Sequence, residues 1–307
     1  MTYEISELSE DLPFGSVVAG LMPDDIEKAA VVEELNRLWI DRGLIVFRQS
    51  DPSPEFQVAL SRCFGPLEPH PVPEIWMDGR PDLISVSSKP EAGIIVSIDG
   101  KNYAGFIPWH ADTMYTPNLN RGGILRVTEA TSWGGETRFL DRIAAHDTLP
   151  SDLKQVVQDM EIVYQMEGLE SSMYIRNFMD LKLVRNSASS TSMLSRIDEV
   201  YPPVVHPAVV VQPETGRTIL NISPHFTKYI IGYSEADSEA LLLRLLQHVA
   251  SQPFYQHSWK GDEMILWDNW RMLHSVTGCP VDEVRTMRRT TIGGRYPHGR
   301  YLQAQAA

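Results

Sequence analysis

The stretch Ile107-Pro108-Trp109-His110-Ala111-Asp112 places a histidine and an aspartate two residues apart, directly after a short apolar run. Residues two apart on a β-strand share a face, so His110 and Asp112 can both point at one ion. Pro108 favours the end or the edge of a strand, which leaves room for a ligand in front of the pair. The pattern alone is more typical of a buried histidine hydrogen-bonded to an aspartate, or of a turn, so it does not by itself predict a metal site.

A second histidine, His274, lies far downstream, after the apolar run Met264–Trp267 and a turn. His110, Asp112 and His274 then form a set of two histidines and one carboxylate. Such a set holds one face of a non-haem Fe(II) and leaves the opposite face open for a cosubstrate and dioxygen. Because Zn²⁺ also accepts nitrogen and carboxylate ligands, a zinc-dependent hydrolase with the same ligands is an alternative. A non-catalytic β-barrel that binds a metabolite is another.

Two arginines, Arg285 and Arg289, follow His274 in the predicted strand 284–292. Their even separation places both on one face of that strand. An unpaired arginine in a protein interior costs several kcal/mol, so two of them require anions, and the planar guanidinium suits a carboxylate. The alternative interpretation places both arginines on an exposed face, with Arg288 directed inward.

Composition limits the class of protein and of partner. The chain has 307 residues, 43% of them hydrophobic and 22% charged, with a formal net charge of −13. This charge argues against nucleic acid or an anionic membrane surface as a partner. The first residues lack the pattern of a secretory signal, and Cys63 and Cys279 are the only cysteines. We therefore expect a cytoplasmic protein with reduced thiols and no transmembrane segment.

No repeat or linker divides the chain, so we predict a single domain spanning residues 1–307. The pattern predicts helices at Ala144–Gln158 and Ser234–Ala250. It also predicts many short strands, which favour a mainly β sandwich or jelly roll with flanking helices: Leu44–Phe47, Leu83–Val86, Ile94–Ile98, Ile124–Thr128, Val209–Val211, Thr218–Asn221, Met264–Trp267 and Thr290–Ile292. The stretch 167–201 fits no regular element and is interpreted as a long insertion that forms a lid over the active site.

Several motifs occur in an order that resembles the taurine / 2,4-dichlorophenoxyacetate dioxygenase (TauD/TfdA) family of Fe(II)- and 2-oxoglutarate-dependent oxygenases. They are Trp109-His110-Ala111-Asp112, Gly134-Gly135-Glu136-Thr137, His206-Pro207 with Pro213-Glu214-Thr215-Gly216-Arg217, Trp267-Asp268-Asn269 with His274, and Arg285 with Arg289. The resemblance covers roughly residues 14–294, nearly the whole chain. It is specific for the family and says little about the substrate.

The resemblance implies a double-stranded β-helix (a jelly roll of the cupin-like type) in which His110, Asp112 and His274 bind Fe(II). It implies that Arg285, helped by the hydroxyl of Thr137, binds the distal carboxylate of 2-oxoglutarate. The cofactor set is then Fe(II), 2-oxoglutarate as cosubstrate, and O2.

The resemblance also implies residues of the substrate site. Arg289 matches an arginine that contacts an anionic substrate or the cosubstrate, and His70 lies in a segment that lines the site in several members. Phe106 stands where some members have an asparagine, which predicts a more apolar pocket on that side.

The expected reaction is oxidation of a small anionic organic molecule, with release of succinate and CO2. Hydroxylation is the expected outcome, and a desaturating or cyclising oxygenase of natural-product biosynthesis is the alternative within the family. Homo-oligomers are frequent in the family, so a homo-oligomer is compatible with the resemblance.

Overall fold

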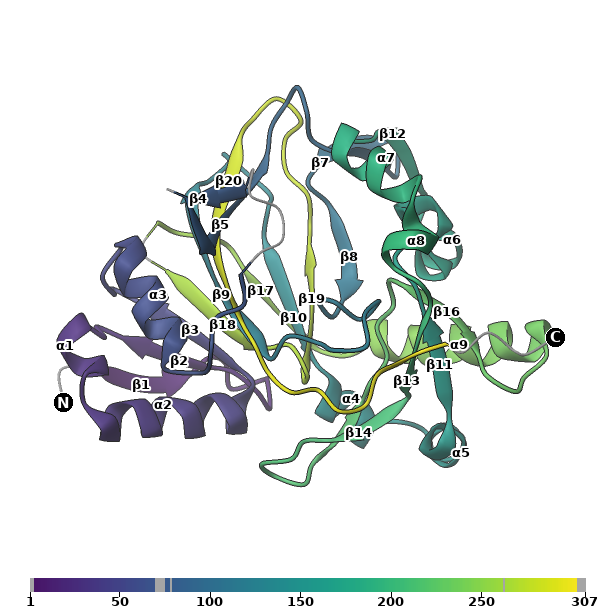
Figure 1. Cartoon of the computed structure of the whole chain (residues 1–307), viewed down its shortest axis with the longest axis horizontal. Helices are drawn as coiled ribbons and strands as arrows, with labels where there is room; N and C mark the ends of the chain where they lie inside the picture. The colour runs from purple at the N-terminus through teal and green to yellow at the C-terminus, as the bar shows by residue number, and fades with distance from the viewer. Residues whose placement is uncertain (1–2, 70–74, 78, 262, 303–307) are drawn as a thin grey trace.

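The computed structural model describes residues 3–69, 75–77, 79–261 and 263–302. Within these residues the chain is mainly β, with strands in several sheets and helices on the outside (Figure 1). The largest sheet has eight strands, in the order β1 (Glu4–Glu7), β2 (Ser16–Ala19), β3 (Leu44–Arg48), β18 (Met264–Asp268), β9 (Gly122–Glu129), β20 (Arg285–Ile292), β5 (Arg80–Ser88) and β4 (Trp76–Met77).

The sheet that carries both histidines has four strands, in the order β17 (Phe254–His257), β10 (Thr137–Asp141), β19 (Met272–Val276) and β8 (Ile107–His110). A further sheet has the order β16 (Thr227–Ile230), β11 (Glu161–Tyr164), β13 (Val204–Pro207) and β21 (Arg300–Tyr301). Two smaller sheets are β12–β6–β7 (Leu181–Arg185, Ile95–Ile98, Lys101–Ala104) and β14–β15 (Val209–Val211, Thr218–Leu220). The predicted short strands therefore form, with small changes at their ends.

The N-terminal helices are α1 (Pro23–Ile26), α2 (Ala29–Arg42) and α3 (Pro54–Arg62). Helix α2 ends at Gly43, whose φ of +73° is the left-handed conformation that glycine adopts without strain. Helix α3 begins after Ser53, whose hydroxyl accepts a hydrogen bond from the backbone N–H of Phe56.

The predicted helix Ala144–Gln158 is wrong as a single element. The structure has α4 (Arg142–Asp147), α5 (Ser151–Val156) and a 3-10 turn, η2 (Val157–Asp159). Pro150 stands between the two helices, and a proline has no N–H to continue a helix. The other predicted helix forms as α9 (Glu235–Ala250), with the hydroxyl of Ser234 accepting from the backbone N–H of Asp237.

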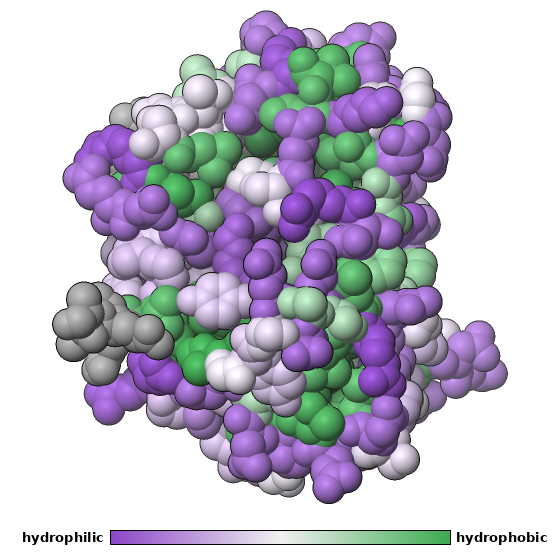
Figure 2. Space-filling view, turned by 90° about the vertical axis from the view of Figure 1, so that its right-hand side faces the viewer, coloured by the Kyte–Doolittle hydropathy of each residue, from purple (hydrophilic) through white to green (hydrophobic). Residues whose placement is uncertain are grey.

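The stretch 167–201 contains short regular elements, which sequence patterns did not reveal. They are η3 (Leu169–Ser171), α6 (Met173–Phe178), the strand β12, α7 (Ala188–Leu194) and α8 (Ile197–Val200). Strand β12 pairs with β6, so this insertion is joined to the rest of the fold by a sheet. The helices gather on the right of Figure 1, away from α1–α3 on the left. On the face that Figure 2 shows, hydrophobic side chains lie in separate groups among hydrophilic ones.

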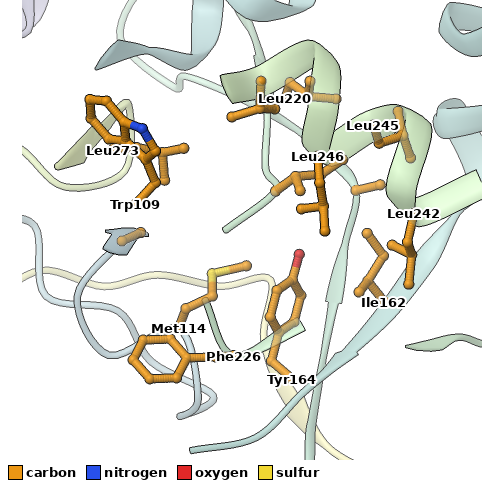
Figure 3. Packing of buried hydrophobic residues seen from close by; sticks show 14 of the residues in the cluster. Trp109, Met114, Ile162, Tyr164, Leu220, Phe226, Leu242, Leu245, Leu246 and Leu273 are labelled. Atoms are coloured by element: carbon orange, nitrogen blue, oxygen red, sulfur yellow. The ribbon is translucent and has the colours of Figure 1, made fainter. Parts of the chain in front are cut away.

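The main hydrophobic cluster lies between α9 and the strands that carry the site (Figure 3). Leu242, Leu245 and Leu246 of α9 pack there with Tyr164 of β11 and Leu273 of β19, and these leucines have no exposed surface. Because Leu273 precedes His274, burial of its side chain fixes the opposite orientation of the histidine. None of the helices in the described parts is both long and apolar enough to cross a bilayer.

Candidate metal centre and substrate pocket

The two histidines lie directly opposite each other on neighbouring antiparallel strands, because His110 of β8 pairs in register with His274 of β19. Side chains of such a cross-strand pair leave the sheet on the same side. Their rings accordingly lie close together, with centroids 4.1 Å apart. Both side chains are about nine-tenths buried. The β-pairing therefore produces the histidine pair without help from any ligand.

Asp112 follows the end of β8 and completes the set. Its Oδ1 lies 3.6 Å from Nε2 of His110 and 3.6 Å from Nε2 of His274. Oδ2 accepts a hydrogen bond of 2.5 Å from Arg289. Burial acts to raise the pKa of Asp112, but the Arg289 guanidinium and the two imidazoles hold this pKa well below its usual range. Asp112 is thus an anion at neutral pH.

The hydrogen bond that His110 makes leaves its other ring nitrogen available to bind a metal ion. Nδ1 of His110 lies 2.8 Å from the carbonyl oxygen of Pro108, and a carbonyl can only accept. Nδ1 therefore carries the proton, and the lone pair of Nε2 faces Asp112. For His274, burial and the neighbouring His110 lower the pKa to about 4.

Asn269 holds the backbone of Asp112 with two hydrogen bonds, one to its N–H and one to its carbonyl. Its Oδ1 accepts from the Asp112 N–H at 2.8 Å, and its Nδ2 donates to the Asp112 carbonyl at 3.0 Å. The same Nδ2 also donates to the carbonyl of Asn120, at 3.1 Å. Asn269 is fully buried, so these bonds do not compete with water. This side chain fixes the place where the chain leaves β8.

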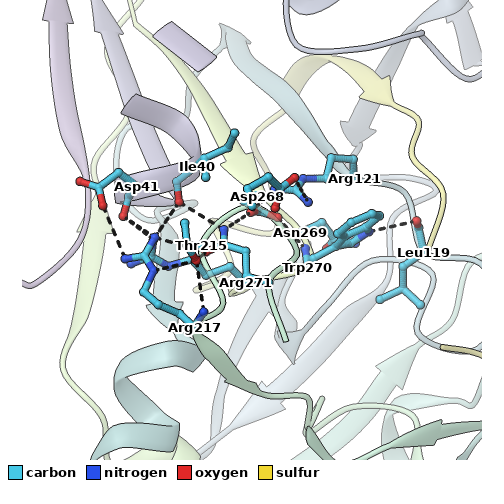
Figure 4. Close-up of polar contacts among 12 residues, drawn as sticks. Ile40, Asp41, Leu119, Arg121, Thr215, Arg217, Asp268, Asn269, Trp270 and Arg271 are labelled. Carbon is cyan, nitrogen blue, oxygen red and sulfur yellow. Dashed lines mark hydrogen bonds and ion pairs between the residues drawn. The ribbon is translucent and has the colours of Figure 1, made fainter. Parts of the chain in front are cut away.

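The turn that carries Asn269 is itself held by buried ion pairs (Figure 4). Arg121 contacts Asp268 at 2.9 Å, and Arg271 makes two hydrogen bonds to Asp141, at 2.7 and 2.9 Å. Arg271 also donates to the carbonyl of Asp41 at the end of α2. The turn 268–271 is therefore anchored to helix and sheet together.

These residues fit a metal ion. Ligand atoms of His110, Asp112 and His274 all lie within 4.8 Å of one another. Two ligands bound side by side to one octahedral ion at about 2.1 Å lie roughly 3 Å apart, so each of the two 3.6 Å distances from Asp112 to a histidine needs to shorten by about half an ångström. Two neutral imidazoles and one carboxylate, on one side only, suit Fe(II) with an open face.

Arg285 and Arg289 lie on the same side of β20, as the even spacing predicted. Arg285 is largely buried, burial lowers its pKa, and one N–H of its guanidinium donates to the carbonyl of Gly135 at 2.9 Å. A Cβ on Gly135 would lie 2.7 Å from Nε of Arg285, so the absence of a side chain lets the guanidinium lie against this loop. Thr137 lies two residues beyond, on β10, and its hydroxyl accepts from Nε1 of Trp259 at 2.9 Å.

The opposite face of β20 is also covered, which the sequence did not predict. Arg288 is buried there under α3, where it donates to Oε1 of Gln57 at 2.7 Å and to the carbonyl of Pro52 at 2.7 Å. The alternative interpretation was therefore right that Arg288 is directed inward, but it was wrong to place Arg285 and Arg289 on an exposed face. Arg289 lies with its guanidinium 5.2 Å from the ring of Trp267, and its Nε is buried with no partner among the described residues.

A cavity of about 690 Å³ opens next to His110. Phe106 lines it, as predicted, together with His225 and Phe226 from the segment before β16. The insertion supplies much of the remaining wall, through Gly168, Leu169, Glu170, Ser171, Leu183, Asn186, Ser190, Leu194 and Ile197. Burial and the nearby His110 lower the pKa of His225 to about 3, so this ring is neutral. His70 lies outside the described residues.

The sequence and the structure match known proteins over nearly the whole chain. Residues 4–291 match the family model "Taurine catabolism dioxygenase TauD, TfdA family". The chain belongs to the TauD/TfdA family of alpha-ketoglutarate-dependent dioxygenases. The dioxygenase is 30% identical over 291 residues to a (S)-phenoxypropionate/alpha-ketoglutarate-dioxygenase of Sphingobium herbicidovorans, covering 92% of this chain and 93% of that one.

Another relative is an alpha-ketoglutarate-dependent 2,4-dichlorophenoxyacetate dioxygenase of Cupriavidus pinatubonensis, 29% identical over 288 residues, with 89% of this chain and 93% of that one covered. Among solved structures, AAD-2 in complex with Mn(II) and N-oxalylglycine matches with a TM-score of 0.71 and 25% identity, covering 97% of this dioxygenase and 100% of that chain. The family assignment confirms an enzyme that uses Fe(II) and 2-oxoglutarate. It decides against the zinc hydrolase and the non-catalytic binding protein.

Sequence reasoning missed three residues that contribute to the dioxygenase site. In the sequence, Asn269 stood out only as part of a motif. No neighbouring residue indicated that its side chain forms hydrogen bonds with the backbone of Asp112. Glu167 and Lys228 lie far apart in sequence, and they meet as an ion pair in the pocket wall. Only the three-dimensional arrangement brings them together.

Proposed function

We propose that this dioxygenase hydroxylates a small organic substrate that carries an anionic group near the metal. The observation that carries this proposal is the convergence of His110, Asp112 and His274 beside a buried arginine and an apolar cavity. When bound, Fe(II) and 2-oxoglutarate would allow O2 to oxidise a C–H bond of the substrate, with release of succinate and CO2. The chain's own residues bind, orient and shield the reactants.

For the cosubstrate, we assign Arg285 and Thr137 to the distal carboxylate of 2-oxoglutarate. Within the described residues, the Arg285 guanidinium donates one hydrogen bond, to the carbonyl of Gly135. It has five N–H donors and so can bind a further acceptor. Thr137 accepts a bond from Trp259, and its own hydroxyl proton can be donated to the same carboxylate. Arg285 and Arg289 are four residues apart on one strand, so their Cα atoms are about 13 Å apart. Arg285 can therefore bind the distal carboxylate of 2-oxoglutarate while the other end of the cosubstrate lies at the metal, near Arg289.

For the substrate, we assign Arg289 to an anionic group at the metal end. The buried Nε of Arg289 has no partner within the described residues, and buried donors normally find an acceptor. Phe106 and Phe226 form apolar walls beside His110. The named relatives act on phenoxypropionate and 2,4-dichlorophenoxyacetate, which combine an apolar body with a carboxylate and support this assignment. We include His70 in the proposed substrate site because of its place in the family motif.

The architecture that we propose is a double-stranded β-helix, formed by one domain over residues 1–307, with 167–201 as its lid. The match to AAD-2 over 97% of the chain supports one domain of that fold. We further propose a cytoplasmic enzyme with a small-molecule substrate and no nucleic-acid or membrane partner, because the net charge is −13 and both cysteines are free. A homo-oligomer is consistent with the family.

The test is succinate release and substrate consumption with Fe(II), 2-oxoglutarate and a panel of aryloxyalkanoates, sulfonates and sulfate esters. We expect turnover that requires Fe(II). Hydroxylation next to the heteroatom gives an unstable adduct that releases a phenol, sulfite or sulfate and leaves a carbonyl compound, so the two products together should exceed the mass of the substrate by one oxygen. Arg285→Met should raise the KM for 2-oxoglutarate by about a hundredfold, since it removes a buried charge-assisted bond. Arg285→Lys should recover part of the loss, and Arg37→Met, at an exposed position on α2, should have no effect. The proposal fails if 2-oxoglutarate gives no charge-transfer band with Fe(II) in the protein and is not converted to succinate.

A further inference from the structure

The pocket beyond the metal is larger and more aliphatic than a short substrate requires. Its volume of about 690 Å³ is in the range of cavities that hold drug-sized ligands. Its aliphatic lining includes Ile107 of β8 and, from the insertion, Leu169, Leu183, Leu194 and Ile197. A site with such walls fits an extended, mainly aliphatic body.

Lys228 lines this pocket at some distance from the metal ligand His110. It lies on β16, two residues after Phe226, a turn residue whose ring centroid is 6.3 Å from that of His110. Two residues of chain span at most about 7 Å, so Lys228 is on the order of 10 Å from His110. An extended chain advances about 3.5 Å for every three bonds, so a substrate that reaches both ends needs on the order of eight bonds.

Glu167 holds Lys228 in this position. Its Oε2 accepts from Nζ of Lys228 at 2.7 Å, and its Oε1 accepts from the backbone N–H of Phe226 at 3.1 Å. The side chain of Glu167 is only 3% exposed, so the carboxylate depends on these two bonds. An ammonium group has three N–H donors, and Glu167 takes one of them. Lys228 can therefore donate to a ligand without breaking its ion pair.

The charges at this end disfavour an anionic group. Among the described residues that line the pocket, the acidic and basic side chains are Glu167, Glu170 and Lys228, whose formal charges sum to −1. Arg176 lies outside this lining and also acts electrostatically on Glu167. Glu167 already neutralises Lys228, and a second anion beside that pair would meet a buried like charge. A neutral oxygen would accept an N–H from Lys228 without this repulsion.

We propose that Lys228, positioned by Glu167, is a specificity-determining residue that binds a neutral oxygen (a hydroxyl, carbonyl or ether) at the far end of an extended aliphatic substrate. This inference rests on the proposed function, because it takes the reacting end of the substrate to lie at the metal and its anionic group at Arg289. The substrate class is then a mainly aliphatic acid whose remote end carries an uncharged oxygen function.

The test compares acids of equal length that differ only at the remote end. Octanoate, 8-hydroxyoctanoate and octanedioate are titrated by calorimetry, without oxygen, into protein loaded with Mn(II) and saturating 2-oxoglutarate, which keeps diacids out of the cosubstrate site. We expect 8-hydroxyoctanoate to bind about tenfold more tightly than octanoate, the difference that one hydrogen bond to a charged group makes, and octanedioate to bind most weakly.

Two variants change this order in opposite ways. Lys228→Met should abolish the advantage of the hydroxyl, so that octanoate and 8-hydroxyoctanoate bind alike. Glu167→Gln keeps an acceptor for the N–H of Phe226 but leaves Lys228 with a net charge, so octanedioate should gain at least about tenfold and become the preferred acid. Lys182→Met, at an exposed position on β12, and Glu199→Gln, at an exposed position on α8, are the matched controls and should keep the wild-type order.

Equal binding of the three acids, binding of none of them, or an unchanged order in both variants would each overturn the inference. Succinate release and the 2-oxoglutarate–Fe(II) charge-transfer band are measured on the same preparations. If these are normal while the acids show no preference, only the role of Lys228 is wrong. If they are absent, the proposed function fails, whatever the acids do.

Discussion

The metal centre and the wall of the substrate pocket are built in different ways. The metal centre gathers His110, Asp112, His274 and Arg289 from strands that are far apart in sequence, and buried polar contacts fix it. The wall comes largely from one continuous stretch, 165–197, of short elements whose side chains are mostly half-buried or exposed. Metal binding therefore depends on the whole fold, whereas the cavity wall depends largely on one local segment.

The strongest test of this contrast removes a ligand. His274→Ala should lower the affinity for Fe(II) by more than about a hundredfold and should abolish succinate release. This loss exceeds the usual effect of changing a residue that only orients a metal ligand. Calorimetric titration with Fe(II) or Mn(II) without oxygen measures this directly. His298→Ala, at an exposed position, is the control. Retention of tight metal binding in the first variant would show that His274 is not a ligand.

Asn269→Ala tests whether the polar contacts around the ligands matter. It removes both hydrogen bonds to the Asp112 backbone, and we expect the Fe(II) affinity to fall by about 10- to 100-fold. Activity at saturating Fe(II) should fall less, because the ligands themselves remain. Asn102→Ala, an exposed residue on β7, is the matched control. An unchanged Fe(II) affinity would contradict a positioning role for Asn269.

A pair of leucine variants compares the stability of the two regions. Leu273→Ala empties a fully buried position beside His274 and should lower the free energy of unfolding by about 2–5 kcal/mol. Leu194→Ala, at a half-buried position in the pocket wall, should lower it by less than about 1 kcal/mol and alter the KM of the substrate several-fold. Urea unfolding of both variants measures this. Equal losses would show that the wall is as much part of the core as β19 is.

The smallest expected effect concerns the stability of the protein at acidic pH. His206 is fully buried, its Nε2 donates to the carbonyl of Thr116 at 3.0 Å, and burial lowers its pKa to about 4. Between pH 6.5 and 4 the unfolded chain binds a proton that the folded chain does not, so stability is lost as the pH falls through this window.

His206→Gln keeps a donor for Thr116 and removes the titration. Between pH 6 and 4.5, the free energy of unfolding of the metal-free variant should fall with decreasing pH less steeply than that of the metal-free wild type. The two slopes should differ by about 1 kcal/mol per pH unit. Identical slopes of unfolding free energy against pH for wild type and variant would contradict this account.

The parts of the site that follow strand alternation could be predicted from the sequence. The spacing of Arg285 and Arg289 predicted correctly that both lie on one side of β20, whereas Asp112 lies beyond the end of β8 and reaches the site from a turn. The family motifs then identified His274 as the third ligand. These inferences need only local geometry and the order of the motifs.

The contacts that could not be predicted depend on long-range pairing. No local pattern shows that Asn269 clamps Asp112, or that Lys228 meets Glu167. The break at Pro150 is different, because the proline was visible in the sequence and local physical chemistry was enough to place it. The insertion resisted prediction because its short elements depend on contacts such as the pairing of β12 with β6.

The position of β9 in the large sheet has a consequence for biosynthesis. Its two hydrogen-bonded neighbours, β18 and β20, come well over a hundred residues later in the chain. While the ribosome is still making the second half, β9 has two open edges, and such edges recruit other nascent chains. A transcript that stops before β18 would therefore give an aggregating fragment rather than a smaller enzyme, and slower translation or chaperone capacity should raise the yield of active protein.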